Sequence, residues 1–220
     1  MRLAVVTAGL SVPSSSRLLA DRLATATAER TGAEVTVVEL RELAGSIAHN
    51  LTAHFPDPRL AAVIDEVTGA DGLIAVTPVF SASYSGLFKS FFDVLEPDAL
   101  TGKPVLMGAT GGTPRHSLVL EHAMRPLFSY LRAVTVPTGV YAASQDWGTA
   151  GDGGGRELHA RVERAAGELA ALMTGPAGRA VAPVTEPEEE RVADAEEPLV
   201  PFAQQLAQLG IEPPPGHREG

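Results

Sequence analysis

Short apolar runs alternate with segments of helical periodicity along most of the chain. Five such runs span residues 3–8, 35–40, 72–77, 104–109 and 134–140. Each run is mostly apolar throughout rather than alternating with polar residues, which is typical of strands covered on both faces in a parallel sheet. The pattern therefore predicts five buried strands.

The segments between these runs predict five helices. The first carries an apolar stripe of Leu18, Leu19, Leu23 and Ala26. The second begins with Asp57 as N-cap and Pro58 at the first helical position, carries Leu60, Val63, Ile64 and Val67, and ends at Gly69. The others are expected over about 84–95, over 115–131 with a kink at Pro126, and along a stripe from Leu158 to Leu172 that Gly175 and Pro176 close.

Alternating strands and helices indicate right-handed βαβ units. Five strands with five helices favour an α/β, flavodoxin-like, doubly wound parallel sheet of order 2-1-3-4-5 within residues 1–175. Residues 176–199 are rich in Pro, Ala and Glu and are expected to be an acidic linker. Residues 200–220 hold Phe202, Leu206 and Leu209 at helical spacing, which predicts a short amphipathic helix and tail. We expect this helix to dock on the protein, the alternative being a disordered end.

Composition narrows the classes of function. The 220 residues are 45% hydrophobic and carry a net charge of -10, and an acidic surface disfavours nucleic acid as a partner. The absence of cysteine excludes disulfides, thiolate nucleophiles and Cys-ligated metals. No apolar run approaches the roughly 20 residues of a membrane span, so a cytoplasmic protein with neither membrane nor metal site is expected.

The carboxyl ends of parallel strands are where a doubly wound sheet binds ligands. The loop after the first strand offers a cluster of hydroxyls and a cation at a helix start, which predicts a phosphate cradle rather than a simple cap: Ser11, Ser14, Ser15, Ser16 and Arg17. The loops after the third and fourth strands are rich in glycine, serine and aromatic residues, which suits close approach to a flat ring: Pro78, Val79, Phe80, Ser83, Tyr84, Ser85, Gly86, Thr110, Gly111 and Gly112.

Other candidates are weaker. The chain lacks GxGxxG and GxxxxGK[ST] after its first strand, which argues against a tightly held dinucleotide and an NTPase. Without that fingerprint, Glu39 fits a solvent-facing strand end better than an NAD ribose ligand. His116 fits a structural role better than acid–base catalysis. Trp147 is expected near the ligand or at a subunit contact, with packing inside its own subunit as the alternative.

The segment from Thr77 to Lys89, the Thr110–Gly112 loop and the serine-rich loop ending at Arg17 together resemble the signature of NAD(P)H-dependent FMN reductases. The resemblance is to the flavin-supplying reductases of two-component monooxygenases, including the alkanesulfonate type. It departs at Phe80, where relatives commonly have tyrosine, and it does not include the tail.

That resemblance implies that FMN phosphate binds the serine-rich loop and that the flavin ring lies against the other two loops. Hydride then passes from NAD(P)H to flavin N5 with no catalytic side chain. It also implies a homodimer or homotetramer and a flavin-dependent monooxygenase as consumer. The alternatives are an FMN-retaining reductase of quinones, azo dyes or metal ions, and a flavodoxin-type electron carrier.

Overall fold

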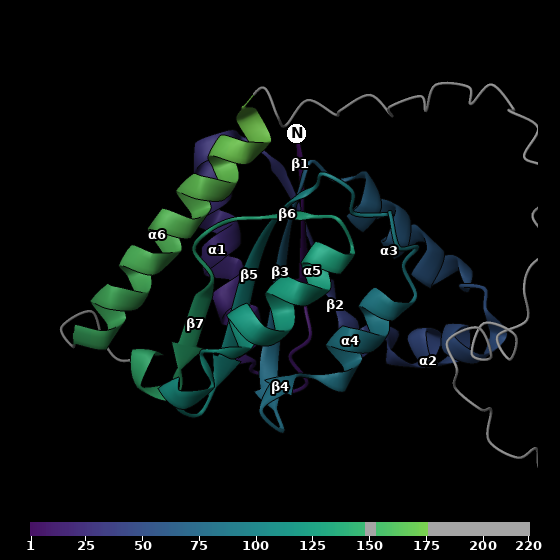
Figure 1. Cartoon of the computed structure of the whole chain (residues 1–220), viewed down its shortest axis with the longest axis horizontal. Coiled ribbons are helices and arrows are strands. Elements are labelled where there is room, and N and C mark those ends of the chain that lie inside the picture. Colours follow the sequence, from purple (N-terminus) through teal and green to yellow (C-terminus); the bar gives the residue numbers. More distant parts are fainter. Residues whose placement is uncertain (148–152, 176–220) are drawn as a thin grey trace, which may run out of the picture. The chain divides into compact units, whose positions relative to one another are not determined.

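A parallel sheet forms the centre of the structure, a computed structural model that describes residues 1–147 and 153–175 (Figure 1). Its order is β2-β1-β3-β5-β6, with β7 also pairing with β5 and β4 pairing antiparallel with β3. The strands are β1 (Arg2–Thr7), β2 (Glu34–Glu39), β3 (Gly72–Phe80), β4 (Ser83–Tyr84), β5 (Pro104–Gly111), β6 (Val134–Thr135) and β7 (Val140–Ala143). The predicted α/β class and strand order are confirmed. The predicted linker and terminal helix lie outside the described residues.

The fifth predicted strand is in fact two short strands. β6 pairs with the start of β5 and β7 with its end. Between them the Val136 N–H still donates to the Val105 carbonyl at 2.9 Å, but Pro137 has no N–H to give. The N–H of Thr138 then donates to the Glu168 carboxylate at 2.8 Å instead of to the sheet. One proline and one competing acceptor therefore interrupt the strand.

Helices cover both faces of the sheet (Figure 1). On one face, α1 (Ser15–Thr31) and α6 (Gly153–Thr174) pack over the apolar side chains of the strands. On the other lie α2 (Ala44–Ala53), α3 (Pro58–Gly69), α4 (Gly86–Asp93) and α5 (Arg125–Tyr130). No helix among the described residues is long and apolar enough to cross a membrane.

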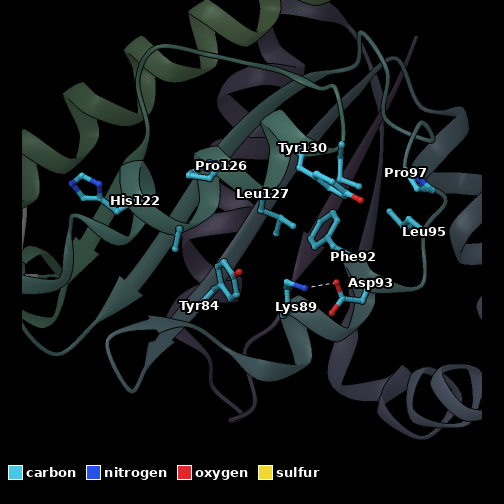
Figure 2. A pocket seen from close by; sticks show the side chains of 12 residues that line it. Tyr84, Lys89, Phe92, Asp93, Leu95, Pro97, His122, Pro126, Leu127 and Tyr130 are labelled. Carbon is cyan, nitrogen blue, oxygen red and sulfur yellow. Dashed lines mark hydrogen bonds and ion pairs between the residues drawn. The ribbon is translucent and has the colours of Figure 1, made fainter. Parts of the chain in front are cut away.

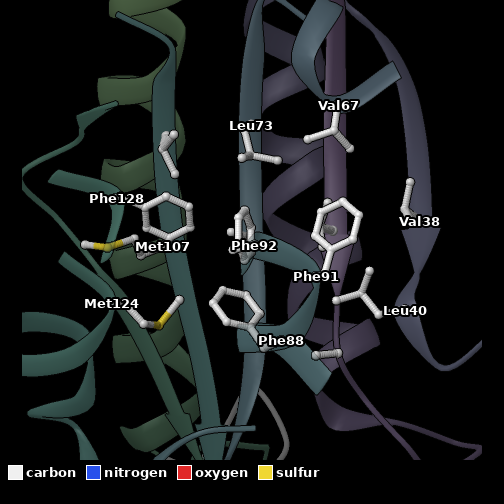
Figure 3. Close-up of a cluster of buried hydrophobic side chains, with 14 of the residues drawn as sticks. Val38, Leu40, Val67, Leu73, Phe88, Phe91, Phe92, Met107, Met124 and Phe128 are labelled. Atoms are coloured by element: carbon white, nitrogen blue, oxygen red, sulfur yellow. The ribbon is translucent and has the colours of Figure 1, made fainter. Parts of the chain in front are cut away.

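Aromatic packing fixes the second face. Phe88 and Phe92 of α4 meet Phe128 of α5, with the Phe92 and Phe128 rings edge to face at 5.0 Å, and Phe91 packs against Phe92 (Figure 3). All four side chains are fully or almost fully buried. Their packing holds α4 and α5 against the face of the sheet formed by β3 and β5.

Two helices follow the sequence prediction closely. The Asp57 carboxylate accepts the Leu60 N–H at 2.9 Å, Pro58 opens α3, and Gly69 ends it. In α1 the buried stripe contains Leu19 and Leu23 as expected, but Leu18 is exposed and does not belong to it.

The largest departures lie where no clear periodicity marked the chain. A 3₁₀ turn (Leu40–Leu43) and α2 follow β2, in a stretch for which the sequence predicted no element. The third helix begins at Gly86, because the residues before it extend β3 and form β4.

The fourth predicted helix is interrupted rather than kinked. A 3₁₀ turn (Pro114–His116) and a π-helical turn (Leu120–Met124) precede α5, and the Arg125 N–H bonds the Leu120 carbonyl five residues back. Pro126 cannot donate to the carbonyl four residues earlier, and its ring would crowd that group, so the widened turn relieves the conflict.

Candidate functional site

The three loops predicted from the sequence meet at the carboxyl edge of the sheet, where the strand order reverses between the parallel neighbours β1 and β3. They enclose a cavity of about 400 Å³, which is the size of a small-molecule site. We call it the switch-point cavity. Its lining residues are Gly9, Leu10, Ser11, Ser14, Ser15, Ser16, Pro78, Val79, Phe80, Thr110, Gly111, Gly112, Ser144 and Trp147.

The loop after β1 forms one end of the cavity. Ser14 is the N-cap of α1, its hydroxyl accepting the Arg17 N–H at 3.3 Å. The N–H groups of Ser15 and Ser16 precede the first intrahelical bond, so they have no partner within the helix. Gly9 permits this arrangement, because a Cβ there would stand 2.0 Å from the Ser14 hydroxyl oxygen. The loop therefore presents free donors where the helix dipole favours an anion.

A buried hydroxyl pair joins this loop to β5. Ser16 Oγ and Thr110 Oγ1 lie 2.8 Å apart, and both residues are almost fully buried. Residues 94 positions apart in sequence are thus fixed to each other at the floor of the cavity. The bond therefore ties the start of α1 to the end of β5.

The end of β3 forms a second wall, and its supports lie behind it. Thr77 Oγ1 accepts the Ser85 N–H at 3.0 Å, and the Ser85 hydroxyl accepts the Phe88 N–H at 3.2 Å as the N-cap of α4. The structure therefore gives Ser85 a capping role. Ser83 pairs with Phe80 in the β3–β4 hairpin, and neither it nor Gly86 is among the residues lining the cavity.

Arg17 does not line the switch-point cavity either. Its Nε lies 2.8 Å from Asp21 and its Nη1 lies 2.5 Å from Glu39, which also accepts from Arg41. The hydrogen bond with Asp21 is the main cause of a raised Arg17 pKa. Two carboxylates thus already compensate the guanidinium, which faces an adjoining hollow that shares Ser11 and Ser14 with the cavity.

The two glycines after β5 differ in role. Neither has a positive φ, so neither is required by the backbone conformation. A Cβ on Gly111 would stand 2.2 Å from the Tyr141 hydroxyl oxygen, so Gly111 makes room for Tyr141. A Cβ on Gly112 would meet no heavy atom within 4 Å. The open space beside Gly112 is therefore available to a ligand.

Sequence reasoning left out three lining residues, Gly9, Leu10 and Ser144. Ser144 follows the second half of the divided fifth strand, and its place at the same sheet edge was the only signal for it. Trp147 does lie at the cavity, half-buried against the α1–α6 face, with the Arg22 guanidinium 5.1 Å from its ring centre. The structure thus shows Trp147 packing within its own subunit, the alternative stated above, and its place near a ligand or a subunit contact stays a prediction.

A larger hollow of about 570 Å³ lies between α4 and the α5 segment (Figure 2). Tyr84, expected in the flavin site, lines this groove together with His122, Tyr130 and the Lys89–Asp93 ion pair. It offers neither a long helix N-terminus nor glycine-rich backbone. The chemistry of a phosphate-bearing planar ligand therefore fits the smaller switch-point cavity better.

The switch-point cavity suits FMN in three respects. Hydroxyls and free N–H groups at one end can bind a phosphate, Pro78 and Phe80 offer apolar surface to a ring, and Gly112 leaves space beside them. None of the lining side chains within residues 1–147 and 153–175 is ionisable. The described residues contain no cluster that could hold a metal ion.

Comparison with known proteins agrees with this geometry. The family model described as NADPH-dependent FMN reductase matches residues 1–148. A Pseudomonas aeruginosa FMN reductase (NADPH) is 39% identical over 66% of this chain and 78% of its own length. The NADH-dependent FMN reductase SfnF of Pseudomonas fluorescens is 36% identical over 67% of this chain and 79% of its own.

Solved structures show the same fold. An oxidoreductase from Corynebacterium diphtheriae superposes with a TM-score of 0.75 at 48% identity, covering 78% of this chain and 96% of its own. The three loops, the cavity they enclose and these relatives lead to one conclusion: the chain belongs to the NADPH-dependent FMN reductase family.

Proposed function

We propose that this protein binds FMN in the switch-point cavity, transfers hydride to it from NAD(P)H, and releases the reduced flavin to a flavin-dependent monooxygenase. The observation that carries the proposal is the convergence of a phosphate-binding helix start and a glycine-rich loop on one cavity, joined by the 2.8 Å Ser16–Thr110 bond. The family supports the same reaction.

The protein's part in this reaction is binding and orientation. Bound FMN supplies the hydride acceptor, its N5 atom. The Ser15 and Ser16 N–H groups would hold the phosphate, and Pro78 and Phe80 would offer apolar surface to the ring. Holding two rings in a reactive geometry lowers the barrier to hydride transfer without a proton-transfer group, which agrees with the uncharged lining.

The uncharged lining also supports exchange of the flavin. Neutral donors bind a phosphate dianion less strongly than cations do, and Phe80, on the cavity wall, is 47% exposed. A flavin held this way can leave after reduction, as delivery to an oxygenase requires. Loss of FMN during gel filtration is expected; tight retention would favour an FMN-retaining quinone, azo or metal reductase.

The activity is tested by steady-state oxidation of NADPH and NADH with FMN, FAD, riboflavin and a quinone as acceptors. Rapid turnover with free flavin supports the proposal. Turnover with the quinone alone would support the FMN-retaining reductase. If no acceptor supports NAD(P)H oxidation, the flavodoxin-type electron carrier would be the remaining alternative. Both nucleotides are needed, because one relative is named for NADPH and another for NADH.

A homodimer or homotetramer is proposed as the working form. Large apolar side chains stand uncovered around the cavity mouth, with Leu10 54% and Val12 76% exposed. Exposed apolar groups beside a site are typical of a surface that another subunit covers. Light scattering at micromolar concentration should report a mass of at least two chains, and a monomer would contradict the proposal.

The tail is proposed to act on stability or assembly and not on hydride transfer. Removing everything after Gly175 should leave flavin reduction unchanged and lower the melting temperature or the oligomer size. Activity, circular dichroism and light scattering on the truncated chain check this. Loss of activity with fold and assembly intact would place the tail in the active site.

A further inference from the structure

Tyr141 lies directly behind the loop that follows β5. Its side chain is almost fully buried, and its hydroxyl donates to the Thr113 carbonyl oxygen at 2.8 Å. The absent Cβ of Gly111 leaves the space that this hydroxyl occupies. The Tyr141 side chain of β7 thus lies behind the Gly111–Gly112 wall of the switch-point cavity and donates a hydrogen bond to the backbone that follows it.

Few other contacts hold this loop. The pairing of β5 with β7 ends at Gly111, opposite Ala143. Beyond it, Thr113 Oγ1 accepts a long bond of 3.4 Å from the Arg115 N–H. Two consecutive glycines, Gly111 and Gly112, make the segment costly to order in entropy. Among the described residues, the Tyr141 bond is therefore the main restraint on the backbone at Thr113.

We propose that Tyr141 is a positioning residue for flavin binding, whose hydroxyl holds the Gly111–Thr113 loop in the conformation that forms the cavity wall. The inference rests on the proposed flavin site. Tyr141 acts through the loop and not on the flavin itself, because it is not among the residues that line the cavity.

The protonation of Tyr141 suits this role. Burial, with a smaller contribution from the charge of Asp146, raises the pKa of the Tyr141 phenol. The hydroxyl therefore keeps its proton at every pH near neutrality. It remains a donor to Thr113 whatever the state of the bound ligand.

Tyr141→Phe tests the proposal because it removes the hydroxyl and keeps the ring. We expect the KM for FMN to rise about 3- to 10-fold, the range for one lost hydrogen bond. The KM for riboflavin should rise by the same factor, because the phosphate loop is untouched. The kcat at saturating flavin should stay near the parental value, because Tyr141 is not among the residues that line the cavity, and circular dichroism should report an unchanged fold.

Tyr130→Phe is the matched control. The Tyr130 side chain is 72% exposed and makes no hydrogen bond among the described residues, so both KM values should remain parental. Parental KM values for Tyr141→Phe would overturn the proposal. A change for FMN alone would overturn it too, because that would place the effect at the phosphate.

Gly111→Ala gives an independent test of the same contact. Its methyl group would collide with the Tyr141 hydroxyl, so flavin affinity should fall. In Gly111→Ala/Tyr141→Phe the combined loss should be smaller than the product of the two single losses, because both changes act on one contact. Independent, multiplicative losses would contradict the proposal.

The proposed site and this inference fail in different ways. If substitution of Gly112, which faces the open cavity, leaves flavin binding unchanged, the site itself is wrong. If substitution of Gly112 abolishes binding while Tyr141→Phe behaves as the parent, only the role of Tyr141 is wrong.

Discussion

Gly112→Val should weaken flavin binding by about 10- to 100-fold or more, the cost of forcing extra methyl groups into a filled site. The position where the new Cβ would stand has no protein atom within 4 Å, so the protein alone would accept it. Because Gly112 lines the switch-point cavity, a ligand bound there would meet the valine methyls. The loss should therefore appear in flavin titration and be absent from circular dichroism and from the melting temperature.

Gly45→Val provides the control. Gly45 also has open space where a Cβ would stand, but it lies near the start of α2 and does not line the cavity. A small loss of stability is expected from a β-branched residue in a helix, with unchanged flavin affinity. If Gly112→Val also titrates like the parent, the loop after β5 does not line the flavin site.

FMN should bind about 100-fold more tightly than riboflavin, or better, because at least two N–H groups can make charge-assisted bonds to its phosphate, each contributing about 1.5–3 kcal/mol. The Ser15 hydroxyl is exposed and has no hydrogen-bond partner among the described residues, so it is free to add another. Ser15→Ala should then weaken FMN binding about tenfold and leave riboflavin unchanged.

Arg17→Ala should also weaken the binding of FMN and leave the binding of riboflavin unchanged. The expected cause is indirect, because Arg17 pairs with two carboxylates and does not line the cavity. Its removal leaves Asp21 without its ion-pair partner and Glu39 with Arg41 alone, and the added negative charge near the phosphate end of the cavity repels the dianion. Ser129→Ala, at an exposed position on α5, should change neither affinity. Equal binding of FMN and riboflavin by the parent protein would refute the phosphate assignment.

Much of the fold could be read from the chain because its signals were local. Continuous apolar runs identified the buried strands, and Asp57 with Pro58 marked the start of α3 before any contact was known. The split of the fifth strand could not be read in this way. It depends on Glu168 of α6 accepting the Thr138 N–H, a contact between residues 30 positions apart.

The candidate site shows the same division. Position at the strand ends predicted Ser14, Pro78 and Gly112, because fold topology alone brings these loops together. The roles of the other predicted site residues depend on the direction of their side chains and on the partners that they find in the folded structure. Ser85 caps α4, and Arg17 is taken up by two carboxylates. The i,i+4 spacing of Arg17 and Asp21 allowed their ion pair, but the pairing of Arg17 with Glu39 of β2 depends on the folded structure.

The structure of the protein crystallised with FMN is the most direct test of the flavin site. We expect the phosphate within hydrogen-bond distance of the Ser15 and Ser16 N–H groups, and the ring between the Pro78–Phe80 segment and Gly112. Electron density for the flavin in the groove between α4 and α5, with the switch-point cavity holding only water, would contradict the assignment.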